Sequence, residues 1–176
     1  MTGGPEVTVL VVTWRARDLL EQCLRALREQ TVGHRLLVVD NASTDGTAAL
    51  LRGFGEARIL RLDRNRGFAG GVAAGLAEVD TELVALLNDD AVPAPGWLGA
   101  LLDAAPGAAA VTSRLLLADG TLNNAGVVLR ADGYGADRAL GEPDGPPYDR
   151  PAEVFGFSGG AALLRIAAVR AVGGFP

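Results

Sequence analysis

Two adjacent carboxylates follow an apolar run in the segment LVALLNDDAVPAPGW, residues 83–97. Asn88, Asp89 and Asp90 come directly after the apolar residues, and prolines then end the extended chain. Because like charges repel, two carboxylates in this place call for a compensating charge. Divalent cations such as Mg²⁺ bind oxygen ligands, often one or two carboxylates together with substrate phosphates. The other interpretation is an acidic turn that caps a helix, which the turn sequence taken alone favours.

A further carboxylate, that of Asp40, ends the apolar run RLLVVD at residues 35–40. At the end of a strand this carboxylate can accept hydrogen bonds from the N–H groups of a nucleobase. The polar residues Ser43, Thr44 and Asp45 follow, and we predict that they cap the next helix, because short polar side chains bind nearby backbone groups.

The segment RNRGFAGGVAAG, residues 64–75, has Arg64 and Arg66 before a glycine-rich helix start. The N–H groups at the start of a glycine-rich helix suit a phosphate, and arginine binds phosphate well. The glycine spacing does not fit the dinucleotide-binding pattern G-x-G-x-x-G, and a Walker loop needs a lysine that this chain lacks. Taken alone, the glycines predict close packing of a helix on a sheet.

Four other side chains carry less information. Trp14 and Trp97 have rings that can stack on a base or a sugar, and we expect one of the two to serve in packing. Cys23 falls on the apolar face of a predicted helix and is expected in the core. His34 has no second histidine for a metal site and no triad partner, so it is predicted at the surface.

Strands and helices alternate along the first 105 residues, with short loops between them. Apolar β-branched runs predict buried strands, and apolar residues at helical spacing predict helices. The predicted strands are 7–13, 35–40, 57–62 and 82–87, and the predicted helices are 15–30, a short one within 41–55, 69–79 and 94–105. This order is typical of an α/β fold with a mostly parallel central sheet flanked by helices, in which ligands bind beyond the carboxyl ends of the strands.

The pattern changes after residue 105. We predict strands at 109–117 and 123–130, joined by a turn. Residues 131–153 are rich in Gly, Pro and Asp and predict a mobile surface loop. The chain then returns to a glycine-rich turn, a short strand and a short helix.

The composition is that of a globular protein, since 49% of the 176 residues are hydrophobic and 21% are charged. The net charge of −5 argues against nucleic-acid binding, because nucleic-acid-binding proteins have a basic face. No apolar run approaches the ~20 residues that cross a bilayer, and the N-terminus lacks the pattern of a signal peptide. The sequence therefore predicts a cytoplasmic protein without a transmembrane segment.

Five segments, taken in their order and spacing, resemble family 2 glycosyltransferases with the GT-A fold, and they cover nearly the whole chain. The matching segments are VVTWRARDLLEQCLRALREQ, LLVVDNASTDGT, NRGFAGG, LLNDDAVPAPGWL and FSGGAALLRIAAVRAVGGF. The segment DGTLNNAGVVL is similar to rhamnosyltransferase-like members. The resemblance implies an inverting transfer of a sugar from a nucleoside diphosphate to an acceptor hydroxyl, with Mg²⁺ or Mn²⁺ as cofactor.

The same resemblance implies roles for particular residues. Asp90 would bind the metal ion where the family has its Asp-x-Asp motif, although Asn88 here replaces the first Asp. Asp40 would contact the base. The full set of implied donor-binding residues is Thr13, Trp14, Asp40, Asn65, Gly70, Asn88, Asp89, Gly159 and Gly160, the last two beneath the donor sugar and the acceptor. The implied donor is a dTDP- or UDP-sugar, and a saccharide or lipid-linked acceptor would place the protein at the inner membrane face.

The family's general base would lie beyond Pro176, so no catalytic base is assigned. We therefore expect a single GT-A-type domain that is truncated at its C-terminus, with a nucleotide-sugar-binding half at 1–105, an incomplete acceptor-side half at 106–176, and weak or absent transfer. The alternative is a nucleotide-sugar-binding module without transferase activity. A nucleotidyltransferase is disfavoured, because it needs a glycine-rich loop directly after the first strand.

Overall fold

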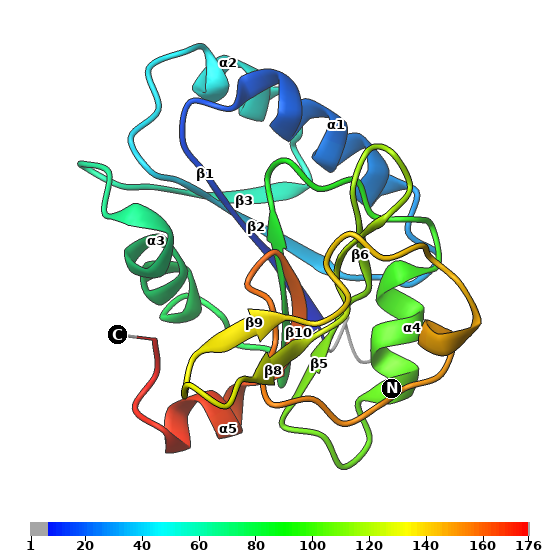
Figure 1. The fold of residues 1–176 in the computed structure, drawn as a ribbon. Coiled ribbons are helices and arrows are strands. Elements are labelled where there is room, and N and C mark those ends of the chain that lie inside the picture. The colour runs from blue at the N-terminus through cyan, green and yellow to red at the C-terminus, as the bar shows by residue number, and fades with distance from the viewer. Residues whose placement is uncertain (1–6, 176) are drawn as a thin grey trace.

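The computed structural model describes residues 7–175 and contains a six-stranded sheet with helices on both faces (Figure 1). The strand order is β3-β2-β1-β4-β10-β5, and only β10 runs against the others. The strands of this sheet are β1 (Val7–Thr13), β2 (Arg35–Asp40), β3 (Ala57–Arg61), β4 (Leu83–Asn88), β5 (Ala110–Thr112) and β10 (Ala161–Arg165). The helices are α1 (Arg17–Arg28), α2 (Thr47–Arg52), α3 (Gly67–Leu76), α4 (Trp97–Ala104) and α5 (Ile166–Ala171). The predicted mostly parallel sheet is confirmed.

The side chains of β1 alternate between two hydrophobic cores, one on each face of the sheet. Val9 and Val11 join the core under α1 and α4, whereas Leu10 and Val12 join the core under α3 and α5. A strand that is buried on both faces is mostly apolar, which is why the strands predicted at 7–13, 35–40 and 82–87 begin and end within one residue of β1, β2 and β4.

Helix α3 lies close to the sheet because two of its four glycines, Gly71 and Gly75, face β1. A Cβ atom added to Gly71 would lie 2.5 Å from a methyl group of Val12, and one added to Gly75 would lie 2.5 Å from a methyl group of Leu10. The predicted close packing of a glycine-rich helix on the sheet is confirmed at these two positions.

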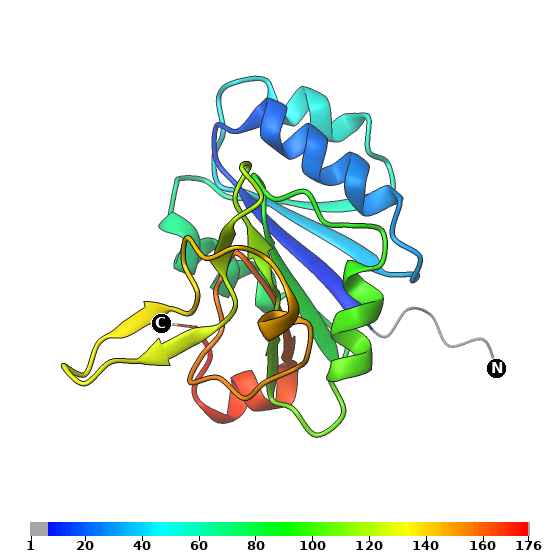
Figure 2. The same ribbon diagram turned by 45° about the vertical axis from the view of Figure 1, so that its right-hand side comes forward.

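The second half of the chain departs from the prediction. The expected strand at 109–117 is two strands, β5 and β6 (Leu115–Leu116), and the one at 123–130 is also two, β7 (Leu122–Asn124) and β8 (Val127–Leu129). The expected loop at 131–153 contains β9 (Gly135–Asp137), which pairs with β8, and a 3₁₀ turn η1 (Pro146–Tyr148). The β8–β9 ribbon projects from the sheet (Figure 2).

The strand predicted at 123–130 is broken after Asn124, and the contacts of Asn124 and the backbone of Gly126 explain the break. The side chain of Asn124 is buried, accepts a hydrogen bond from the N–H of Gly126 at 2.7 Å and donates to the carboxylate of Asp137 at 2.5 Å. Gly126 has a φ of +106°, which residues other than glycine rarely adopt. The chain therefore turns between β7 and β8 and continues into the ribbon.

Among residues 7–175, none of the helices has the length and apolar character that crossing a membrane requires.

Candidate functional site

Parallel pairing brings the ends of β1, β2 and β4 to one edge of the sheet. In the register of the strands, Thr13 lies opposite Asp40, and Val12 lies opposite Asn88 on the other side of β1. The sequence patterns predict this edge as the binding edge, and the register brings Thr13, Asp40 and Asn88 together there.

Asp40 is buried, with 1% of the residue exposed. One carboxylate oxygen accepts a hydrogen bond of 2.8 Å from the N–H of Ser43, and the other forms an ion pair with Arg61. The Arg61 guanidinium also donates to the carbonyl of Ser43 at 2.9 Å. The sequence patterns do not predict the ion pair between Asp40 and Arg61. The two residues end neighbouring strands and lie opposite each other in the register.

Asn41 is another buried polar residue at this edge, and the sequence patterns assign no role to it. It is 2% exposed; its amide oxygen accepts a hydrogen bond from the N–H of Arg66 at 2.8 Å, and its amide nitrogen donates to the carbonyl of Gly67 at 2.9 Å. Asn41 thereby ties the end of β2 to the start of α3. The available signal is a polar residue placed directly after a buried strand.

The acidic cluster follows β4 directly. Asp89 is partly buried, whereas Asp90 is exposed. Burial raises the pKa of the Asp89 carboxyl above its usual value, and the neighbouring charge of Asp90 adds to the rise. The hydroxyl of Thr13 and the backbone N–H of Trp14 lie near enough to offset part of it. Within residues 7–175, neither carboxylate forms an ion pair.

The hydroxyl of Thr13 is buried and has no hydrogen-bond partner of normal geometry in the described part of the chain. A buried hydroxyl without a partner costs about 1–3 kcal/mol. Thr13 lies between Asp40 and Asp89 at the edge, so a polar ligand that reaches this point would regain that free energy.

The acidic cluster has the chemistry of a divalent metal site that is completed by a substrate. Over residues 7–175, no group of three or more His, Cys, Asp or Glu side chains is arranged to hold a metal ion by itself. Asp89 and Asp90 supply carboxylate oxygens, and Mg²⁺ is commonly held by one or two carboxylates, waters and phosphate oxygens. The residues present therefore fit a Mg²⁺ or Mn²⁺ ion that binds together with a diphosphate.

The glycine-rich turn before β10 lies beside the acidic cluster. The carbonyl of Gly160 accepts a hydrogen bond from the N–H of Asn88 at 2.9 Å. A Cβ atom added to Gly160 would lie 3.7 Å from the Asn88 amide nitrogen, and one added to Gly159 would lie 3.0 Å from the ring of Phe68. The antiparallel strand β10 thus brings Gly159 and Gly160 to the same edge as Asn88, although they are far apart in sequence.

Asn65 lies in the connection between β3 and α3, and Gly70 lies near the start of α3. The exposed Asn65 accepts a hydrogen bond from the N–H of Gly67 at 2.8 Å. A Cβ atom added to Gly70 would lie 2.7 Å from the Cβ atom of Arg66, so glycine leaves room for that arginine. Both residues shape this connection, which Asn41 fastens to the edge.

The two tryptophans differ in their surroundings. Trp97 packs against the core under α4 and donates from its ring N–H to Ser113 at 2.9 Å. Trp14 is 48% exposed at the edge, with the guanidinium of Arg15 at 5.4 Å from its ring centre. The prediction that one tryptophan serves in packing is confirmed for Trp97, and Trp14 remains open to a ligand.

Neither Cys23 nor His34 forms a catalytic pair within residues 7–175, although the Cys23 thiol contacts the carbonyl of Asn88 at 3.6 Å. Cys23 is fully buried, and burial together with the charges of Asp89 and Asp90 raises its pKa to about 12, so its thiol is unreactive. His34 is half-buried and pairs with the carbonyl of Val32 at 3.1 Å. The core position predicted for Cys23 is confirmed.

The predicted capping of α2 is wrong for two of the three residues. The hydroxyl of Ser43 accepts a hydrogen bond from the N–H of Arg15 at 3.0 Å, and the hydroxyl of Thr44 accepts from the Arg15 guanidinium at 2.9 Å. These side chains bind the loop after β1, because parallel pairing puts that loop next to the loop after β2. Arg15 and Ala42 both have positive φ values, +54° and +64°, which is strain typical of functional loops.

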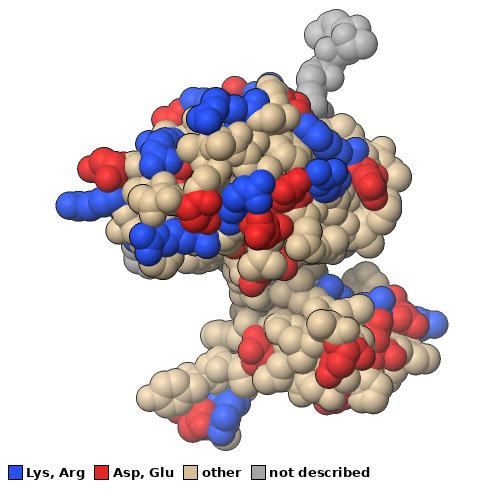
Figure 3. Space-filling view, turned by 90° about the horizontal axis from the view of Figure 1, so that it is seen from above, with Lys and Arg blue, Asp and Glu red and all other residues tan. Residues whose placement is uncertain are grey.

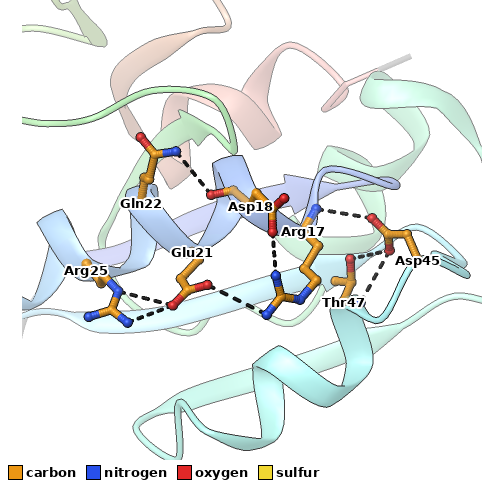
Figure 4. A network of polar contacts seen from close by, with 7 residues as sticks. All are labelled: Arg17, Asp18, Glu21, Gln22, Arg25, Asp45 and Thr47. Carbon is orange, nitrogen blue, oxygen red and sulfur yellow. Dashed lines mark hydrogen bonds and ion pairs between the residues drawn. The ribbon is translucent and has the colours of Figure 1, made fainter.

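Asp45 holds the starts of two helices (Figure 4). Its carboxylate accepts a hydrogen bond from the N–H of Arg17, the first residue of α1, at 3.1 Å, and another from the hydroxyl of Thr47, the first residue of α2, at 2.6 Å. These hydrogen bonds lower the pKa of the Asp45 carboxyl. The two loops at the edge are therefore fastened to each other by side chains.

The molecule is hollowed between a larger body and a smaller one when it is seen from above (Figure 3). The larger body carries most of the visible arginines, and the smaller one shows mainly acidic and uncharged residues. A parallel sheet with polar side chains gathered at its carboxyl edge is the layout of a nucleotide-binding α/β protein.

The chain belongs to glycosyl transferase family 2, whose family model matches residues 8–172. It is 32% identical over 152 residues to the O-antigen biosynthesis protein RfbC of Myxococcus xanthus, a match that covers 82% of this chain and 12% of that protein. The chain therefore spans only a small part of the length of this relative.

Solved structures show the same fold. The mannosyltransferase PcManGT from Pyrobaculum calidifontis, in complex with GDP-Man and Mn²⁺, is similar with a TM-score of 0.71 and 23% identity, over 99% of this chain and 48% of that chain. TarS 1-349 of S. aureus, in complex with UDP-GlcNAc, is similar with a TM-score of 0.56 and 19% identity, over 62% of this chain and 34% of that chain. The fold is the GT-A fold of nucleotide-sugar glycosyltransferases.

Proposed function

We propose that the chain binds a nucleoside diphosphate sugar at the carboxyl edge of its sheet and that the protein transfers the sugar to an acceptor hydroxyl. Membership of glycosyl transferase family 2 supports this function. The observation that carries it is the alignment of Thr13, Asp40 and Asn88 at one edge, with a buried hydroxyl that lacks a partner among the described residues.

The nucleoside binds at the ends of β1 and β2 in this proposal. Asp40 faces the base, Trp14 offers an exposed ring, and the Thr13 hydroxyl gains the hydrogen bond that it lacks in the described part of the chain. The remaining donor-binding residues are Asn65 before α3, Gly70 near the start of α3, Asn88 and Asp89 at the end of β4, and Gly159 and Gly160 of the turn before β10.

The diphosphate lies at the end of β4, where Asp90 binds a divalent metal ion, Mg²⁺ or Mn²⁺. The metal ion, when bound, supplies a positive charge that stabilises the leaving diphosphate. The presence of Mn²⁺ with GDP-Man in PcManGT supports this assignment. Inversion needs a general base that faces the acceptor hydroxyl, and no residue within 7–175 is assigned to that role.

We also propose the chemical class of the donor and of the acceptor. The segment DGTLNNAGVVL supports a rhamnosyltransferase-like enzyme with a dTDP-sugar, and UDP-sugars fit the same site. The O-antigen role in the name of RfbC supports a saccharide or lipid-linked acceptor, met at the inner membrane face. Residues 1–105 form the donor half and residues 106–176 part of the acceptor half.

Isothermal titration calorimetry tests the donor site. We expect UDP, GDP or dTDP to bind in the presence of Mn²⁺ or Mg²⁺ and to bind more weakly in EDTA. If no nucleoside diphosphate binds under any condition, the proposed function is wrong. Release of nucleoside diphosphate from the bound sugar donor, with and without saccharide acceptors, then separates a transferase from a module that only binds the donor.

A further inference from the structure

Phe68 is an exposed aromatic residue at the proposed site that the sequence patterns leave without a role. It lies in the first turn of α3 and is 43% exposed. A Cβ atom added to Gly159 would lie 3.0 Å and 3.4 Å from two atoms of the Phe68 ring. The ring therefore rests against the turn before β10 while part of its surface faces solvent.

The backbone before Phe68 is fixed by buried and local hydrogen bonds. Asn41 binds the N–H of Arg66 and the carbonyl of Gly67, and Asn65 accepts from the N–H of Gly67. Gly67 itself has a φ of +70°. The position of the Phe68 ring is therefore set by the edge of the sheet and does not depend on a free loop.

The turn that the Phe68 ring contacts is hydrogen-bonded to the end of β4, next to the acidic cluster. Gly159 is followed by Gly160, whose carbonyl accepts the hydrogen bond from Asn88, and Asp89 and Asp90 come next in the chain. Phe68 thus lies on the side of the site where the diphosphate and the sugar are proposed, and the base is proposed at Asp40 on another strand.

We propose that the exposed surface of the Phe68 ring is the platform for the apolar face of a pyranose ring at this site. This inference rests on the proposed function. The C–H groups on one face of a pyranose are apolar and weakly positive, and the face of an aromatic ring is apolar and negative, so the two attract each other.

The pyranose comes from one of two sources, the donor sugar or a saccharide acceptor. Calorimetry with a nucleoside diphosphate and with the corresponding nucleotide sugar measures what the donor sugar adds to binding. Saturation-transfer NMR with methyl hexopyranosides, recorded in the presence of the nucleoside diphosphate and Mn²⁺-free Mg²⁺ buffer, detects an acceptor-type sugar. The wild-type chain, Phe68→Ala and Phe68→Tyr are compared in both arms.

We expect Phe68→Ala to leave the affinity for the nucleoside diphosphate unchanged and to weaken sugar binding about tenfold in one arm, the loss expected for an apolar contact of this size. Phe68→Tyr keeps the ring face and should restore sugar binding. A loss in the calorimetric arm identifies the donor sugar, and a loss in the NMR arm identifies the acceptor. Unchanged sugar binding in both arms overturns the inference.

Gly159→Ala gives a second test, because the added methyl group would lie 3.0 Å from the Phe68 ring and would shift the ring by a few tenths of an ångström. We expect it to weaken sugar binding in the wild-type background and to cause no further loss in the Phe68→Ala background. Losses that add in the double variant would contradict the role of the turn in positioning the ring. Gly33→Ala is the matched control, since a Cβ atom at Gly33 meets nothing within 4 Å. If the wild-type chain binds no nucleoside diphosphate, the proposed function fails first and the inference falls with it.

Discussion

Asp40 at the end of β2 and Asp89 beyond β4 lie on either side of β1 at the same edge of the sheet, but their charges are compensated differently. Asp40 is paired with Arg61 and accepts the N–H of Ser43. Within residues 7–175, Asp89 and Asp90 have no basic partner, and burial raises the pKa of Asp89. The carboxylate of Asp40 is therefore neutralised within the chain, whereas no cation among residues 7–175 neutralises Asp89 or Asp90.

The difference follows from burial, because Asp40 is buried whereas Asp89 is partly buried and Asp90 is exposed. A buried charge must be paired, because an unpaired one costs several kcal/mol. An acidic pair at a partly exposed edge costs much less and keeps its oxygens free for a metal ion. Three substitutions sharpen this comparison or break it.

Arg61→Ala should have the largest effect, because it leaves the buried carboxylate of Asp40 without its cation. We expect the free energy of unfolding to fall by about 2 kcal/mol, less than for a fully buried pair because the Arg61 side chain is 48% exposed. Urea denaturation measures the loss. Arg58→Ala, on the same strand, removes an exposed pair with Glu78 and should cost at most about 0.5 kcal/mol. Equal losses would show that Asp40 does not depend on Arg61.

Asp90→Ala tests the proposal that the acidic cluster binds a metal ion. We expect the gain in nucleoside diphosphate affinity from Mg²⁺ or Mn²⁺ to shrink about tenfold, or ~1.4 kcal/mol, while the affinity in EDTA stays the same. Calorimetry with and without the metal ion gives both values. Asp103→Ala, an exposed carboxylate of α4, is the control. A metal-dependent gain that survives Asp90→Ala would remove Asp90 from the metal site.

Asp89→Asn should have the smallest effect and the opposite sign. Since the folded state raises the pKa of Asp89, ionisation opposes folding, and this penalty is absent at pH values below the usual carboxyl value and grows as pH rises through the raised pKa. The amide removes the penalty, so the variant should be more stable than the wild type at pH 7, by at most about 0.5 kcal/mol because water screens this partly exposed carboxyl, and equally stable near pH 3. Urea denaturation from pH 3 to pH 8 tests this. A stability difference that does not vary with pH would contradict it.

The first half of the fold is predictable because its strands are buried on both faces. Such strands are continuous apolar runs that end where polar residues begin, so β1, β2 and β4 are found within one residue. Helix ends are less regular: the helix predicted at 15–30 spans Arg17–Arg28. The prediction for residues 109–130 is wrong because the strands there are short, and their breaks depend on the contact of Ser113 with Trp97 and of Asn124 with Asp137 of β9.

The sequence by itself determined the type of fold and the edge at which polar side chains gather, because apolar runs and the polar residues that end them are local properties of the chain. It could not determine which carboxylate is neutralised. Arg61 lies 21 positions from Asp40, and only the parallel register of β2 and β3 brings the two charges together. In the same way, Gly159 reaches Phe68 and Gly160 reaches Asn88 only because β10 inserts antiparallel beside β4. Pairing between distant segments is a property of the folded sheet, and it decides which polar groups of this edge are already satisfied and which remain free for a ligand.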